Sequence, residues 1–253
     1  MSEPTNSGEH GPRFDISQFG TLGPEGDIKR ILVVAAHPDD LETSCGGTMA
    51  LLVDAGVEVA LLLGTDGDIG THDLSYTRES LAATRREETL AGAAALGLKE
   101  VFFLGHHDGE LAPDLRLRAE IAGVYRRFQP DTILTFDPYW HGQAHPDHTA
   151  AGRAAVDAYM PSKMELYHPE QLTGGVKVAD VKRFFFFGGS ERANAITVDI
   201  TNAWERKVKA TRCHVSQFGQ REEALQWLEE WNRETGKCCG LEFAEAFTPM
   251  TVW

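Results

Sequence analysis

The sequence predicts an α/β fold in which a mainly parallel sheet lies between two layers of helices, a three-layer sandwich. Apolar runs alternate along the chain with longer segments whose apolar residues recur at helical spacing. The apolar runs themselves do not alternate with polar residues, which is typical of parallel strands buried on both faces. Gly56 and Gly97 each close a helical segment, at the position where helices commonly end.

The first half of the chain shows the alternation most clearly. Residues 1–28 are polar and rich in glycine and proline, so we expect a loose, partly disordered lead-in before one α/β domain over 29–253. The elements expected next are a strand at 30–36, a helix at 46–56, a strand at 57–64, a helix at 76–98 and a strand at 100–105.

The pattern continues to about residue 160 and then changes. Residues 163–195 are expected to form a loop and one further strand, 183–188. The remaining elements expected are a helix at 115–129, a strand at 131–136, and helices at 149–160, 202–215 and 221–235.

The composition argues against several classes of function. A formal net charge of −14 in 253 residues disfavours nucleic-acid binding and anionic membrane surfaces, both of which rely on lysine and arginine. No apolar run is long enough to span a membrane, and the first residues lack a secretory signal, so we expect a cytoplasmic protein. The cysteines form no CxxC pattern and are expected to be reduced thiols: Cys45, Cys213, Cys238 and Cys239.

Polar clusters follow the expected strands at the points where they end. His37–Asp40 (HPDD) follows the first strand, and Phe136–His148 follows the strand at 131–136 and contains a second HPD tripeptide. In open parallel sheets, ligands bind at the carboxyl ends of the strands. The two HPD motifs are therefore expected to converge on one metal ion.

The spacing of these residues suits a catalytic metal site. His37 and Asp40 are close enough in sequence to reach one ion, and His148 completes a set of three ligands that leaves a fourth position for water. Asp39 is then left beside that water as a general base. His145 is expected to stabilise an oxyanion or to protonate a leaving amine, and Asp147 to orient a histidine.

At these residues the chain resembles a known family. AAHPDDLETSCGGTMA resembles the signature of the PIG-L / LmbE-like deacetylases, which use zinc to remove acetyl groups from N-acetylglucosamine units. The resemblance extends over residues 30–220 and includes TRREETLAGAAALGL, FLGHHDGEL, PDTILTFDPYWHGQAHPDHTAAGRAA and VDITNAWERKVKATRCHVSQ. It implies a Rossmann-like, LmbE-like fold and a cofactor of Zn²⁺, with Fe²⁺ as an alternative.

The resemblance also implies roles for single residues. The zinc ligands would be His37, Asp40 and His148, with Asp39 as the general base and His145 acting on the tetrahedral intermediate or the amine. Arg85 matches a position that grips polar groups of the substrate, and Asp108 one that contacts sugar hydroxyls.

The implied activity is hydrolysis of an N-acetyl group on an N-acetylglucosamine-containing small molecule or glycoconjugate. A metal-bound water would attack the amide carbonyl, with Asp39 as base, releasing acetate and a free amine. The alternatives are an amidase acting on a related conjugate, a metallophosphoesterase and a non-catalytic sugar-binding module. The expected partner is the amino-sugar substrate alone, without nucleic acid or membrane, and a homo-oligomer is possible.

The sequence leaves the roles of three features open. Glu42 could cap the following helix or touch sugar, and His214 suits packing better than a fourth ligand position. The loop 139–144 lacks the tyrosine that some relatives carry just before the histidine. Tyr139, Trp140 or His141 could replace its substrate-polarising role.

Overall fold

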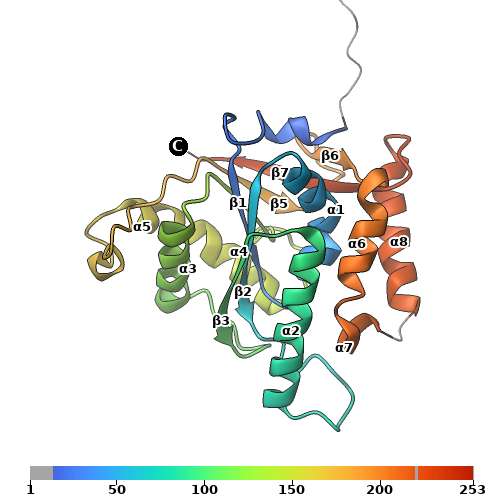
Figure 1. Ribbon diagram of the computed structural model, residues 1–253, viewed down its shortest axis with the longest axis horizontal. Helices are drawn as coiled ribbons and strands as arrows, with labels where there is room; N and C mark the ends of the chain where they lie inside the picture. The colour runs from blue at the N-terminus through green and yellow to red at the C-terminus, as the bar shows by residue number, and fades with distance from the viewer. Residues whose placement is uncertain (1–13, 220–221, 253) are drawn as a thin grey trace, which may run out of the picture.

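The computed structural model describes residues 14–219 and 222–252 (Figure 1). Its strands form a seven-stranded sheet in the order β3-β2-β1-β4-β5-β7-β6. The five strands from β3 to β5 run parallel, whereas β7 pairs antiparallel with both β5 and β6. The strands are β1 (Arg30–Ala35), β2 (Glu58–Thr65), β3 (Glu100–His106), β4 (Thr132–Thr135), β5 (Arg183–Phe187), β6 (Ile196–Asp199) and β7 (Ala244–Thr251).

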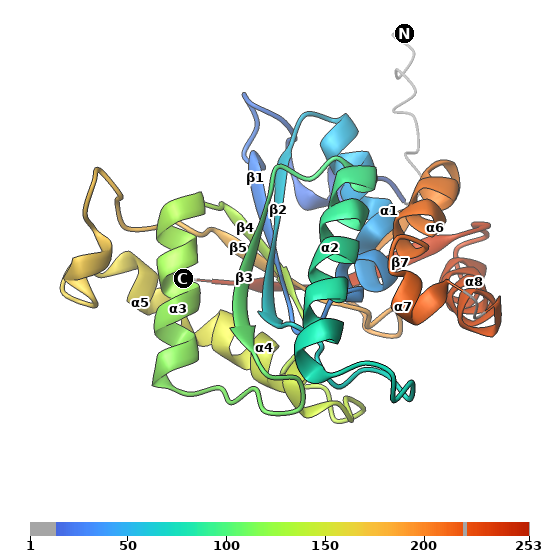
Figure 2. The same ribbon diagram turned by 60° about the horizontal axis from the view of Figure 1, so that its bottom comes forward.

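Helices cover both faces of the sheet, which gives the three layers expected from the sequence (Figures 1 and 2). One layer contains α1, α2, α6 and α8, and the other contains α3, α4 and α5. The helices are α1 (Asp40–Asp54), α2 (Arg78–Leu96), α3 (Leu115–Phe128), α4 (Pro146–Asp157), α5 (Tyr159–Lys163), α6 (Trp204–Thr211), α7 (Val215–Phe218) and α8 (Glu222–Lys237). None of the helices described is long and apolar enough to cross a bilayer.

Strand β1 lies at the centre of the sheet and supplies two hydrophobic cores. Ile31 and Val33 pack into the core beneath α1, while Leu32 and Val34 pack into the core beneath α3 and α4. All four side chains are at most 2% exposed. Since successive residues of a strand point to opposite faces, an unbroken apolar run is what a strand covered on both sides requires.

The order of strands creates a switch point between β1 and β4. The chain runs outward from β1 through β2 to β3, then returns through α3 to pair β4 with the opposite edge of β1. Loops on the two sides of such a point diverge and leave a crevice at the carboxyl ends of the strands. Both HPD motifs follow these two strands, so the fold brings them to the same crevice.

The structure also differs from the expected elements. Residues 14–28, expected to be loose, contain a short helix at Ile16–Phe19 and bury Phe19 and Ile28; residues 1–13 lie outside the described part. Helix α1 begins at Asp40, not at residue 46, and α4 begins at Pro146, so both motifs enter the first turn of a helix. The strands β6 and β7 were not expected.

A buried ion pair holds α1 against the C-terminal strand. Lys207 and Glu245 lie 2.6 Å apart, and their side chains are 0% and 2% exposed. Glu245 accepts hydrogen bonds from the N–H groups of Gly47 and Thr48, while Lys207 donates to the carbonyl oxygen of Thr43. The pair thus satisfies backbone groups in the middle of the helix that carries Asp40.

Lys207→Met is expected to lower the free energy of unfolding by about 3–5 kcal/mol, because it leaves the Glu245 carboxylate buried without its partner. Urea denaturation would measure the loss. Lys237→Met is the matched control, since the Lys237–Glu234 pair is about three-quarters exposed and contributes little. Equal urea midpoints for the two variants would contradict the prediction.

Candidate active site

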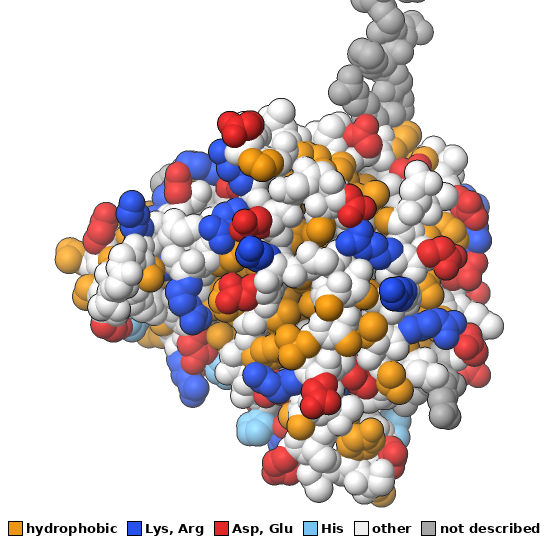
Figure 3. Space-filling model, in the orientation of Figure 1, with side chains coloured by type: hydrophobic (Ala, Val, Ile, Leu, Met, Phe, Trp, Pro, Cys, Tyr) orange, Lys and Arg blue, Asp and Glu red, His pale blue; other side chains and the backbone are white. Residues whose placement is uncertain are grey.

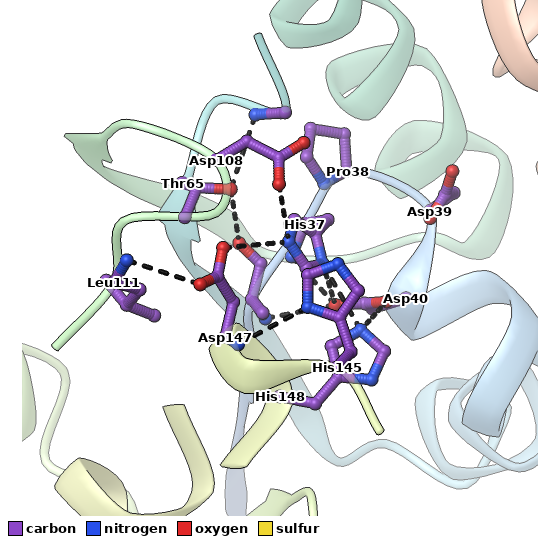
Figure 4. A network of polar contacts seen from close by, with 12 residues as sticks. His37, Pro38, Asp39, Asp40, Thr65, Asp108, Leu111, His145, Asp147 and His148 are labelled. Atoms are coloured by element: carbon purple, nitrogen blue, oxygen red, sulfur yellow. Dashed lines mark hydrogen bonds and ion pairs between the residues drawn. The ribbon is translucent and has the colours of Figure 1, made fainter. Parts of the chain in front are cut away.

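The HPDD motif directs its two aspartates to different sides. Asp39 has φ 96°, a left-handed conformation that is costly for a residue other than glycine. Asp40, the next residue, starts α1 and accepts hydrogen bonds on Oδ2 from the N–H groups of Ala36 and His37. Figure 4 shows Asp40 pointing towards the histidines and Asp39 pointing away from them. The backbone turn therefore separates two neighbouring carboxylates and gives them different partners.

Three potential metal ligands face one another at the crevice. His37 Nδ1 lies 3.2 Å from His148 Nε2 and 3.5 Å from Asp40 Oδ2, and His148 Nε2 lies 3.3 Å from Asp40 Oδ1. Ligand atoms about 2.1 Å from a tetrahedral zinc ion stand about 3.4 Å from one another. The His37–His148 and His148–Asp40 Oδ1 separations match that spacing, whereas the Asp40 oxygen that His37 contacts, Oδ2, already accepts from two backbone N–H groups. His37, His148 and Oδ1 of Asp40 are therefore the candidate ligands of one metal ion.

The described residues contain two further groups of possible ligands, and both include His37. One combines His37 with His145 and His148, and the other combines it with Asp108 and Asp147; within each group the ligand atoms lie within 4.8 Å of one another. His145 is therefore an alternative ligand to Asp40. The carboxylates of Asp108 and Asp147 lie on the other side of the His37 ring.

Those two carboxylates orient His37. Its Nε2 lies 3.2 Å from Asp108 Oδ1 and 3.2 Å from Asp147 Oδ2, so this nitrogen carries the proton and Nδ1 is free to bind a metal. Although burial opposes protonation, the contacts with Asp108, Asp147 and Asp40 raise the pKa of His37 to about 12. Such a surplus of negative charge favours a cation at this place.

Asp147 also connects two loops of the crevice. Its side chain is fully buried and accepts hydrogen bonds from the N–H groups of Gly109 at 2.7 Å and Leu111 at 3.2 Å, both after β3. The structure thus places Asp147 as the orienting partner of His37, and Asp108 in the same position. Asp108 is 6% exposed, which leaves little of it for contact with a sugar hydroxyl.

Asp39 is paired with Arg85 of α2. Arg85 Nη2 donates to Asp39 Oδ2 at 2.9 Å and to the carbonyl oxygen of Pro38 at 2.6 Å, and Nη1 donates to the carbonyl oxygen of Gly67 at 3.0 Å. Arg85 is only 3% exposed, so the structure places it behind Asp39. Burial raises the pKa of Asp39 to about 6, and Arg85 opposes that rise.

His145 and His148 are held by ring stacking. The ring of His148 lies between Phe136, at 3.9 Å and 9°, and His145, at 4.7 Å and 20°. His145 Nδ1 accepts a hydrogen bond from the N–H of Asp147, so a neutral His145 carries its proton on Nε2. Burial, followed by the nearby His37 and His148, lowers the pKa of His145 and favours this neutral form.

Comparison with known proteins identifies the family. Residues 32–159 match the family described as PIG-L: GlcNAc-PI de-N-acetylase, and this segment contains both HPD motifs. The chain belongs to the PIG-L family. Its α/β fold matches that of a solved N,N'-diacetylchitobiose deacetylase.

Similar proteins include deacetylases and a hydratase. A diacetylchitobiose deacetylase of Thermococcus kodakarensis is 33% identical over 88% of this chain and 83% of its own. The N,N'-diacetylchitobiose deacetylase structure from Pyrococcus horikoshii, bound to its inhibitor MPG, superposes with a TM-score of 0.82 at 32% identity, covering 89% and 85% of the two chains. A 4-oxalmesaconate hydratase of Pseudomonas putida is 29% identical over 75% of this chain and 74% of its own.

The PIG-L chain also contains a set of contacts that the sequence did not reveal. Residues 214–217 bind three elements around the crevice: His214 Nε2 lies 3.3 Å from Glu42 Oε2 of α1, and Ser216 donates to Glu88 of α2 from both N and Oγ. Gln217 donates to the carbonyl oxygen of Gly70, in the loop after β2. The polar sequence HVSQ, residues 214–217, was the one sign of these contacts in the sequence, but the residues that it contacts lie far away in the chain.

Gly92→Ala tests the packing of the buried Glu42–His214 pair. A Cβ at this position would stand 2.5 Å from Glu42 Oε1 and 3.1 Å from His214 Nε2, so we expect a loss of about 1–3 kcal/mol in unfolding free energy. Gly46→Ala is the control: the nearest atom to its Cβ would be 3.5 Å away, and alanine should stabilise this helix by about 0.5–1 kcal/mol. Thermal unfolding of both variants would measure the difference, and shifts of the same sign would contradict it.

Proposed function

We propose that the protein is a metal-dependent N-deacetylase of an N-acetylglucosamine-containing small molecule or glycoconjugate, with zinc as the expected metal. The observation that carries the proposal is the set of His37, Asp40 and His148, spaced for one ion and accompanied at the neighbouring Asp39 by a partly buried pair with Arg85. The similarity to two diacetylchitobiose deacetylases supports this reaction class. Acetate and a free amino sugar would be the products.

The residues of the chain suit amide hydrolysis. A bound divalent ion supplies Lewis acidity, which lowers the pKa of a water molecule and polarises a carbonyl group. Asp39, held by Arg85, accepts a proton from the attacking water, whose oxygen bonds to the acetyl carbon. His145 donates a hydrogen bond from Nε2 to the oxyanion. Asp39 then gives the proton that it took from water to the amide nitrogen as the carbon–nitrogen bond breaks, which releases the acid and the free amine.

Some narrower statements also belong to this proposal. Zn²⁺ fits the nitrogen and oxygen ligands, and Fe²⁺ is the second candidate. A cytoplasmic location, a possible homo-oligomer and a single domain over residues 29–253 remain predictions from the sequence. The metallophosphoesterase alternative is disfavoured because Arg85, which would be needed to bind a phosphate, is already paired with Asp39.

Amine release from a panel of N-acetylglucosaminyl compounds tests the reaction. The panel should contain N-acetylglucosamine, N,N'-diacetylchitobiose, and the inositol and malate conjugates, each incubated with zinc-loaded and with chelated protein. Zinc-dependent release of free amine from at least one compound is expected. No release across the panel with zinc bound, or hydration of 4-oxalmesaconate in its place, would overturn the proposal.

A further inference from the structure

Asp68, in the loop after β2, lies two contacts away from a proposed metal ligand. Its Oδ1 accepts a hydrogen bond from the N–H of Asp108 at 2.9 Å. The carboxylate of Asp108 in turn lies 3.2 Å from His37 Nε2, the ring nitrogen that is not proposed to bind the metal (Figure 4). A short chain of contacts therefore joins Asp68 to His37.

The carboxylate of Asp68 is buried and has partners on both oxygens. Its side chain is 4% exposed, and Oδ2 lies 2.7 Å from Arg78 Nε and 2.7 Å from His107 Nδ1. Although burial opposes ionisation, these contacts and the N–H of Asp108 lower the pKa of Asp68 to about 2, so it is ionised at neutral pH. Figure 3 shows charged and histidine side chains gathered at the lower end of one face, where the loops after β2 and β3 lie in Figure 1.

Asp68 and Asp147 hold the loop after β3 from two sides. Asp147 accepts from the N–H groups of Gly109 and Leu111, and Asp68 accepts from the residue before them. Gly109 has φ 80°, a left-handed conformation that turns the chain between the two carboxylates. Because a buried peptide N–H requires an acceptor, loss of the Asp68 carboxylate would let the peptide of Asp108 turn, and the side chain would turn with it.

We propose that Asp68 is a positioning residue, which fixes the Asp108 carboxylate against His37 Nε2 and thereby strengthens metal binding at Nδ1. A carboxylate on the second nitrogen of a ligating histidine fixes the ring and raises its basicity. In the part of the chain that the structure describes, Asp68 makes no hydrogen bond or ion pair with the proposed ligands, so its effect must pass through Asp108. This inference rests on the proposed metal-dependent function.

The zinc affinity of the purified protein, measured by competition with a chromophoric chelator, tests the proposal in a double-mutant cycle. Asp108→Ala should weaken zinc binding about 10- to 100-fold, and Asp68→Ala about tenfold. The double variant should bind zinc at most about twofold more weakly than Asp108→Ala alone, because Asp68 acts only through the Asp108 carboxylate. General damage to the loop would instead add the full effect of Asp68→Ala.

Two further variants separate positioning from such damage. Asp68→Asn keeps an oxygen for the N–H of Asp108, and its amide group can donate to Nδ1 of a neutral His107, so most of the zinc affinity should be recovered. Asp66→Ala is the control, because Asp66 lies in the same loop but its side chain pairs with Arg86 of α2. Its zinc affinity should stay within about twofold of the wild type.

Unchanged zinc affinity in Asp68→Ala, or additive losses in the double variant, would overturn the positioning role. If Asp68→Ala does not fold, Asp68→Ser replaces it in the cycle and must show the same non-additive loss. Amine release decides the proposed function separately. Variants with the expected zinc affinities in a protein that releases no amine would uphold the positioning role and reject the deacetylase, whereas a wild-type protein that binds no zinc would reject both.

Discussion

Asp39→Asn is expected to lower kcat about 10²- to 10⁴-fold, while the protein still binds metal in the wild-type amount. The asparagine side chain has nearly the same shape and can still accept from Arg85, but it cannot take a proton from water. Asp40, His37 and His148 keep their mutual contacts, so the metal site should persist. Steady-state kinetics with metal analysis of the same samples would measure both quantities.

Asp66→Asn is a closely matched control for this prediction. Asp66 pairs with Arg86 of α2 at 2.9 Å, the same distance at which Asp39 pairs with Arg85. The two carboxylate side chains are 20% and 19% exposed. The arginines differ, since Arg86 is 42% exposed and Arg85 only 4% exposed. Asp66→Asn therefore controls for the effect of removing a paired carboxylate on kcat, while Asp39→Asn is expected to cost more unfolding free energy. If Asp39→Asn retains turnover within about tenfold of the wild type, another group accepts the proton and the assignment of Asp39 is wrong.

The sequence was sufficient to predict the five parallel strands of the sheet and the convergence of the two HPD motifs. Its buried parallel strands have a local signature, an unbroken apolar run, and the rule for carboxyl ends then places both motifs at one crevice. The strand β7 has no such signature. Its sequence AEAFTPMT contains Glu245, which is buried only because Lys207 arrives from α6, and Pro249, which interrupts the pattern of a strand.

Which residues contact one another in the site was harder to predict than which residues belong to it. Substrate contact by Arg85 and Asp108 stays a prediction, and the sequence did not reveal that these two residues are buried against Asp39 and His37. Which side of a residue meets solvent depends on the packing of α2 and of the loop after β3, and motif spacing contains no information on that. The same limit applies to Glu42, whose partner His214 lies near the other end of the chain.

His148→Ala is expected to lower the bound metal at least about tenfold and kcat/KM at least about 100-fold. Residues that only hydrogen-bond to a metal ligand typically cost about 10- to 100-fold in metal affinity or activity when mutated, and loss of a ligand itself should cost more. Metal analysis after dialysis and initial-rate kinetics would measure both losses. His106→Ala is the control: the two imidazoles are each 20% exposed, but His106 pairs with Glu120 of α3 at 2.6 Å. It should retain metal and activity.

His145→Ala completes the comparison, because it separates the two ligand sets that include His148. If Asp40 is the third ligand, His145→Ala keeps the metal and loses mainly kcat, since only the donor to the oxyanion is removed. If His145 is the third ligand, His145→Ala releases the metal, as His148→Ala does, and Asp40→Asn retains it. The backbone N–H groups bonded to Asp40 Oδ2 leave its Oδ1 free beside His148, which favours the first result.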